Sequence, residues 1–154
     1  MLPSCVPSTK YDESVTNLTS EHLKLFYCHP RVLGLSEVMS YSKILNKDKE
    51  LLKKVNDAKE ANKIVNGPAP LLTGKNFGKY ISAGIQSDHE CSSFEEAKER
   101  IQKGQYIMIR EGTSTRNLEG LINLLDAPYS DRCMLVAYDK HAKDLMDNGH
   151  IDYN

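Results

Sequence analysis

The chain has almost no excess charge of either sign, since 20 Lys and Arg side chains face 21 Asp and Glu among its 154 residues. A net charge of −1 gives no electrostatic preference for nucleic acid or for an anionic membrane surface. No apolar run approaches the ~20 residues that a helix needs to cross a bilayer, and there is no repeat or low-complexity tract. We therefore expect one soluble domain over residues 1–154, with no separate second domain and no nucleic-acid or membrane partner.

Cysteine is also scarce. Cys5, Cys28, Cys91 and Cys133 lie far apart, without a C-x-x-C pair and without a preceding secretory signal. This spacing argues against a disulfide framework or a zinc site, and it favours reduced thiols in a cytoplasmic protein. The sequence likewise has no glycine-rich phosphate loop, no nucleophile elbow and no aromatic, basic face typical of nucleic-acid binding.

Short apolar runs alternate with longer amphipathic stretches, which is typical of βα units with a parallel sheet. Ser93 is expected to cap a helix that ends at Gly104, and residues 106–109 should follow as a strand buried on both sides. The same order is expected upstream, where a helix begins at Thr73 and a short strand begins at Ile85. The pattern predicts an α/β fold.

Polar or turn residues follow each predicted strand. The expected strands have these last apolar positions: Leu35, Val65, Ile85, Ile109 and Ala137. In parallel α/β folds, sites are assembled at the carboxyl edge of the sheet. We therefore expect the functional residues immediately beyond these positions.

Glu37, His89 and Asp139 each stand shortly after such a strand. Carboxylates and an imidazole that converge from several strand ends can hold a divalent metal, which lowers the pKa of a bound water towards ~7. Taken singly, a histidine after a strand is more often a turn or packing residue, and Glu37 alone favours a solvated or helix-capping carboxylate. The three residues together are a stronger signal for a metal site than any one of them. Asp88 and Glu90, which flank His89, either orient its imidazole and carry protons or complement the dipole of the next helix.

The remaining polar candidates have weaker signals. His22 and His29 are expected on the surface, and His141 is expected at the start of the last helix. Arg110, Glu111 and Arg116 either contact a substrate or its neighbouring loop, or they form an Arg/Glu salt bridge.

Several stretches match the sequence pattern of a single family. They read MLPSCVPST, HPRVLGLSEVMSY, NGPAPLLTGKNFGKYISAGIQSDHECSSFEEA, GQYIMIREGTSTRNLEGL and DRCMLVAYDKHAKDLMDNGHID, in order along nearly the whole chain. The chain resembles bacterial-type adenine deaminases of the amidohydrolase superfamily. This resemblance implies an incomplete TIM-type (β/α)8 barrel, with about strands 3 to 8 and their helices. It also implies hydrolytic deamination of adenine to hypoxanthine and ammonia, with Mn²⁺ or Fe²⁺ as the metal.

The resemblance assigns roles to particular residues. Glu37 matches the family's bridging metal carboxylate, and His89 matches the metal-binding histidine after the sixth barrel strand. Two positions depart from the family pattern. Pro68 stands where the family has a histidine ligand, and Tyr138 stands at the first of two acidic positions, which leaves only Asp139 as an acid/base group.

The family's His-x-His pair is absent from the sequence. With so few ligands kept, we expect weak metal binding and impaired activity of this chain alone. Because open barrel edges pair with other strands, we expect a homo-oligomer or a partner chain that completes the barrel. The sequence thus predicts an adenine deaminase-like protein whose substrate class is adenine or a related purine. The alternative is a catalytically inactive fragment or partner subunit with a degenerate purine or metal site.

Overall fold

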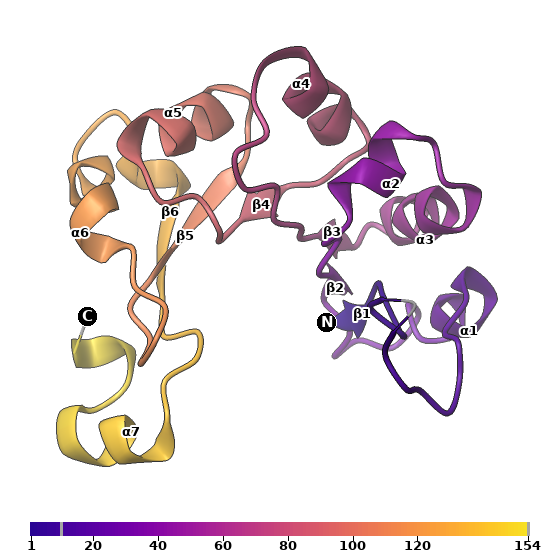
Figure 1. Cartoon of the computed structure of the whole chain (residues 1–154), viewed down its shortest axis with the longest axis horizontal. Coiled ribbons are helices and arrows are strands. Elements are labelled where there is room, and N and C mark those ends of the chain that lie inside the picture. The colour runs from indigo at the N-terminus through magenta and orange to yellow at the C-terminus, as the bar shows by residue number, and fades with distance from the viewer. Residues whose placement is uncertain (10, 154) are drawn as a thin grey trace. The chain divides into compact units, whose positions relative to one another are not determined.

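The computed structural model of the chain describes residues 1–9 and 11–153 (Figure 1). The chain divides into two compact units, Met1–Ser87 and a second that begins at Asp88. The expectation of a single domain over residues 1–154 stays a prediction. No helix in the described residues is long and apolar enough to span a bilayer, and all four cysteines are free thiols.

The first unit is built on a small parallel sheet with strand order β1-β2-β3. Its elements are β1 (Leu2–Pro3), α1 (Ser20–Lys24), β2 (Gly34–Ser36), α2 (Tyr41–Leu45), α3 (Lys49–Glu60), β3 (Ile64–Val65) and α4 (Gly74–Ser82). Leu35 pairs with Leu2 on one side and with Val65 on the other. His22 and His29 are exposed, as expected.

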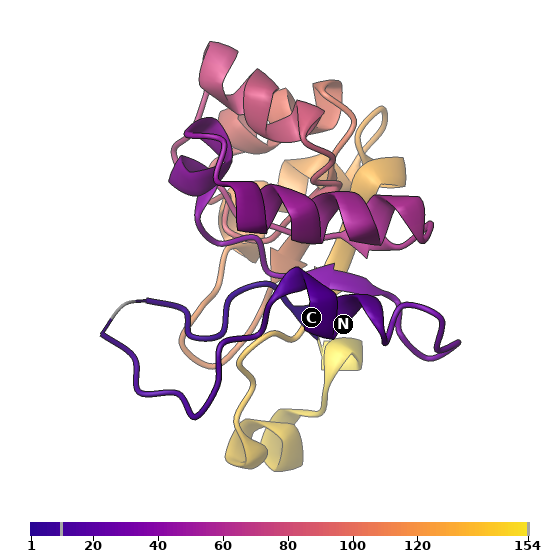
Figure 2. The same ribbon diagram turned by 90° about the vertical axis from the view of Figure 1, so that its right-hand side faces the viewer.

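The core of this unit lies between the strands and their helices. Helix α3 packs against β2 and β3 and is the long purple helix that runs horizontally in Figure 2. Asp48 precedes the helix as its N-cap, and its carboxylate accepts a hydrogen bond from the Leu51 amide (2.8 Å). Its residues Val55 and Ala58 are fully buried. Helix α3 is therefore amphipathic, with one face buried against the sheet.

The second unit contains the remaining elements. They are β4 (Ser87–Asp88, which spans the unit boundary), α5 (Phe94–Gln102), β5 (Tyr106–Arg110), α6 (Leu118–Leu121), β6 (Cys133–Val136), α7 (Ala142–Asn148) and short 3-10 helices at Ile122–Leu125, Ser130–Arg132 and Ile151–Tyr153. The strand order is β4-β5-β6, and β5 and β6 pair in parallel. A separate core contains Ile107, Ile109, Ala97 and Leu121.

Most local predictions are confirmed. Ser93 caps α5, where its hydroxyl accepts a hydrogen bond from the Glu96 amide (3.3 Å), and the helix ends before Gly104. Thr73 precedes α4, and His141 precedes α7. The α/β class with parallel strands is confirmed, while the TIM-type barrel stays a prediction.

Two details differ from expectation. The strand expected to begin at Ile85 begins at Ser87, because the Gln86 amide and side chain both bind the backbone of Val65 (2.8 and 3.0 Å). Strand β1 has no periodic signal because it contains only two residues, and only the family resemblance, which begins at about the third barrel strand, implied it. Burial of residues 106–109 on both sides is wrong: Ile107 is fully buried, but Tyr106 is 41% exposed. The outer face of β5 is therefore only partly covered.

Gly34 should be sensitive to substitution, because β2 and β3 approach too closely there for a side chain. A Cβ at this position would lie 2.0 Å from the carbonyl oxygen of Ile64. We expect Gly34→Ala to lower the free energy of unfolding by about 1–3 kcal/mol through overpacking. Gly78→Ala is the control, because a Cβ on this α4 residue meets nothing within 4 Å, and it should stabilise by roughly 0.5–1 kcal/mol. Urea unfolding measures both, and equal effects would contradict the packing argument.

Candidate functional site

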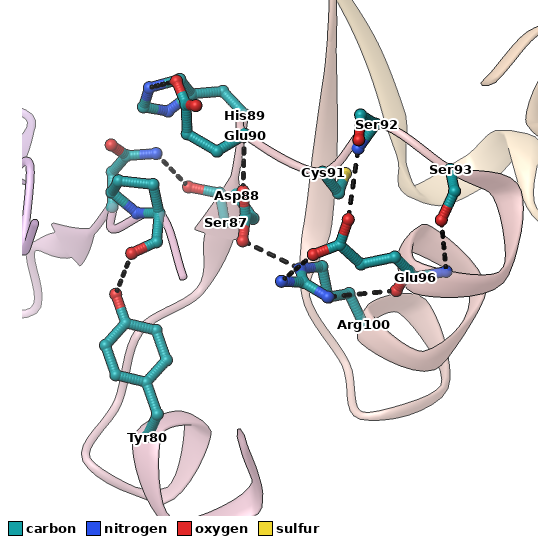
Figure 3. A network of polar contacts seen from close by, with 12 residues as sticks. Tyr80, Ser87, Asp88, His89, Glu90, Cys91, Ser92, Ser93, Glu96 and Arg100 are labelled. Carbon is teal, nitrogen blue, oxygen red and sulfur yellow. Dashed lines mark hydrogen bonds and ion pairs between the residues drawn. The ribbon is translucent and has the colours of Figure 1, made fainter. Parts of the chain in front are cut away.

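A buried ion pair fixes the end of β4. Asp88 and Arg100 are both fully buried, and Arg100 Nε donates to Asp88 Oδ2 at 2.9 Å (Figure 3). Arg100 also contacts Glu96 Oε1 at 2.8 Å, within helix α5. The other oxygen of Asp88 accepts the Glu90 amide at 2.6 Å. Asp88 therefore binds β4 to α5 and shapes the turn that carries the next two residues.

His89, which is buried, and Glu90, which is partly exposed, are the next two residues of this turn. His89 is 4% exposed, and its Nε2 lies 3.5 Å from Glu90 Oε1. The same Glu90 oxygen accepts a hydrogen bond from Arg110 Nη1 at 2.7 Å, from the last residue of β5. The Arg110 partner is thus Glu90, whereas Glu111 lies 3.5 Å from Arg116. The salt-bridge alternative for Arg110 holds, with a different carboxylate.

Tyr138 completes the cluster from the end of β6. Its ring centroid lies 5.3 Å from that of His89, and the Arg110 guanidinium lies over the ring at 5.2 Å. The residue has φ +50°, a left-handed conformation that is an outlier for a bulky side chain and is concentrated at functional positions. About half of the side chain, 51%, is exposed. The ends of β4, β5 and β6 therefore bring His89, Glu90, Arg110 and Tyr138 together.

Sequence analysis missed Asn117, which holds these strand ends in place. Asn117 is 6% exposed. Its Oδ1 accepts the Arg110 amide at 2.6 Å, and its Nδ2 donates to the Cys91 carbonyl at 2.8 Å. The only sequence signal was an asparagine directly before the helix α6, a common capping position.

Asp139 binds a loop of its own unit. Its carboxylate accepts the Ser114 and Thr115 amides (3.3 and 3.5 Å) and lies where a Cβ on Gly112 would be, 1.7 Å away. Burial raises the pKa of Asp139, but hydrogen bonds from Thr115 and Ser114 lower it more, so the pKa lies below its ordinary value. In this geometry the Asp139 carboxylate holds the loop in place. The acid/base roles of Asp139, Asp88 and Glu90 stay predictions.

Glu37 belongs to the first unit. It follows β2 and lines a cavity of about 220 Å³ together with Ser4, Cys5 and Met39. Its backbone carbonyl accepts a hydrogen bond from the Ser4 hydroxyl. The role of Glu37 as a metal ligand stays a prediction.

The side chains around His89 do not fit a Mn²⁺ or Fe²⁺ ion. Such ions need several nitrogen and oxygen donors around one point, and no group of three His, Cys, Asp or Glu side chains in the described residues has this arrangement. Glu90 is bound to Arg110, Asp139 is bound to loop amides, and the neighbour of His89 is the ring of Tyr138. The metal itself stays a prediction from family resemblance.

Comparison with known proteins adds an independent finding. No protein-family model matches the chain. It is 44% identical to adenine deaminase 2 of Carboxydothermus hydrogenoformans over 153 residues, which are 99% of this chain and 26% of that protein. It is 45% identical to the adenine deaminase of Clostridium acetobutylicum (99% and 27%) and 38% identical to that of Halalkalibacterium halodurans (100% and 26%). The chain thus spans about a quarter of the length of these curated relatives.

Removal of Arg100 should destabilise the second unit strongly. Arg100→Met leaves the buried Asp88 carboxylate without its partner, so we expect a loss of about 3–5 kcal/mol in the free energy of unfolding. Asp88→Asn in the same chain should recover part of this loss, because the fully buried charge of Asp88 is then removed. Arg116→Met is the control: this side chain is 61% exposed, and its removal should cost at most about 1 kcal/mol. A small effect at Arg100 in urea unfolding would contradict the assigned role.

Cys91 should be inert in the folded chain. Burial, followed by the nearby charge of Asp88, raises the pKa of Cys91 to about 12. Since the thiolate is the reactive form, at pH 8 only on the order of one Cys91 in ten thousand is reactive. Iodoacetamide should therefore label the exposed Cys28 and leave Cys91 unlabelled until urea unfolds the chain. Peptide mass spectrometry reads both sites, and equal labelling under native conditions would disprove the burial of Cys91.

Proposed function

Since the chain is homologous to a part of the adenine deaminases, we propose that it serves the hydrolytic deamination of adenine, or a related purine, to hypoxanthine and ammonia. We propose further that it supplies one edge of the purine site and that residues 1–154 alone convert adenine poorly. The observation that carries this proposal is the convergence of His89, Glu90, Arg110 and Tyr138 at the ends of three neighbouring strands.

These side chains suit an aminopurine. The Glu90 carboxylate can accept a hydrogen bond from an amino group, and Arg110 can donate to a ring nitrogen or carbonyl oxygen. The half-exposed ring of Tyr138 offers a surface on which a planar base can stack. Deamination also needs one group that takes a proton from water and one that protonates the leaving amine. His89 and Glu90, 3.5 Å apart, are the pair available for these transfers.

The same geometry explains why conversion should be slow. The side chains around His89 do not fit a metal, and the resemblance places Pro68 and Tyr138 at two lost ligand positions. A side chain alone must then deprotonate a water that no metal has made more acidic. We therefore propose that a second copy or another chain contributes the remaining groups in the active form.

A second candidate function is binding without conversion, as an inactive subunit. The observation that favours it is the engagement of the local carboxylates: Asp88 binds Arg100, Glu90 binds Arg110, and Asp139 binds loop amides. The aromatic and cationic groups remain suited to holding a purine.

With added Mn²⁺, the purified chain should consume adenine and release ammonia at least about 100-fold more slowly than the full-length Clostridium acetobutylicum enzyme assayed in parallel. The reason is that metal affinity and activity fall steeply with each lost group of a metal site. His89→Ala and Glu37→Gln should abolish any remaining turnover. His22→Ala is the matched control, since His22 is exposed on α1, and it should change nothing. Turnover equal to that of the full-length enzyme would overturn the proposed impairment.

Equilibrium dialysis with adenine then separates the two candidate functions. Binding without turnover, weakened about tenfold by Tyr138→Ala and kept by Tyr138→Phe, indicates a binding subunit in which the ring stacks on the base. Loss of both binding and turnover in the wild-type chain would refute a purine site in residues 1–154.

A further inference from the structure

A small cavity in the first unit contains a buried amine. The cavity has a volume of about 220 Å³ and includes Lys54, Ser4 and Cys5 among its lining residues. Lys54 lies on α3 and is only 5% exposed. Lysine is almost never fully buried unless it is paired, so the surroundings of this amine call for an explanation.

Lys54 has a single hydrogen bond and no salt bridge within the described part of the chain. Its Nζ donates to the carbonyl oxygen of Ser4, just after β1, at 2.8 Å. That contact uses one of the three N–H donors of the ammonium group. Lys54 also lines the cavity.

The two carboxylates of the cavity are already bound elsewhere. Asp48 Oδ1 accepts the Leu51 amide at 2.8 Å, and Glu50 Oε1 accepts the Ser20 amide at 2.5 Å. Burial lowers the pKa of the Lys54 amine more than the nearby charges of Glu50 and Asp48 raise it. A lower pKa means that more of Lys54 is neutral at pH 7–8, and the neutral amine is the nucleophilic form.

We propose that Lys54 is a carbonyl-reactive lysine and that the cavity admits a small aldehyde, which Nζ binds covalently as an imine. The lone pair of the neutral amine forms a bond to the carbonyl carbon, and a proton passes from nitrogen to oxygen. The carbon–oxygen bond then breaks, the oxygen leaves as water with a second proton from nitrogen, and a carbon–nitrogen double bond remains. No oxidant or reductant is needed. This reactivity does not depend on the proposed purine chemistry.

Reductive trapping tests the proposal. The chain is incubated with acetaldehyde and cyanoborohydride at pH 7.5, and peptide mass spectrometry measures the rate at which each lysine gains an ethyl group. Lys53 is the internal control: it precedes Lys54 on the same helix, its side chain is 44% exposed, and its hydrogen bond and charge interaction with Glu21 raise its pKa. We expect Lys54 to react at least about tenfold faster than Lys53, because burial lowers the pKa of Lys54 and Glu21 raises that of Lys53, so that more of Lys54 is neutral.

Two variants sharpen the result. Lys54→Arg keeps a donor for the Ser4 carbonyl but removes the nucleophile, so the fast adduct should disappear. Lys43→Arg changes an exposed lysine of the same cavity and should leave the Lys54 adduct intact. In urea the rates at Lys53 and Lys54 should become similar, because burial is lost. A Lys54 that reacts no faster than Lys53 in the native wild-type chain would overturn the proposal, whether or not Lys54→Arg folds.

Discussion

The second unit depends on the buried ion pair between Asp88 and Arg100. Taking both charges out of water is costly, and only direct contact with good hydrogen-bond geometry offsets that cost. Arg100 meets this condition through Asp88 at 2.9 Å and Glu96 at 2.8 Å. Since Asp88 is the last residue of β4, the ion pair holds the end of this strand and thereby positions the next two residues, His89 and Glu90. The position of the candidate site follows from this one contact.

The contacts that assemble the site also limit its chemistry. Arg110 holds Glu90 beside His89 through one oxygen of the Glu90 carboxylate, Oε1, which leaves that oxygen less available to a metal. Asp139 supports the loop after β5, and its carboxylate oxygens are then bound to loop amides. What remains accessible is an aromatic ring, strained at φ +50° and flanked by a guanidinium and an imidazole.

Local elements were predictable because their signals are local. The Ser93 cap, the end of α5 before Gly104 and the strand that follows each depend on residues within a few positions of one another. Family resemblance placed His89 and Tyr138 at their strand ends, and the structure brings these two rings together. The pattern of the residues does not show the short strand β1, which only the resemblance implied, and it does not show the role of Asn117. Neither has a periodic signal, and both depend on partners distant in the sequence.

The sequence by itself determined the α/β class, the helix caps and the placement of His89 directly after a strand, because hydrophobic periodicity and turn chemistry act over short distances. Tertiary structure alone decided which polar groups are available for chemistry. Asp88 is bound by a residue 12 positions away, Glu90 by one 20 away and Asp139 by one 25 away. Nothing in the spacing of the sequence encodes such partners, since folding chooses among all charges and amides that burial brings within hydrogen-bond distance.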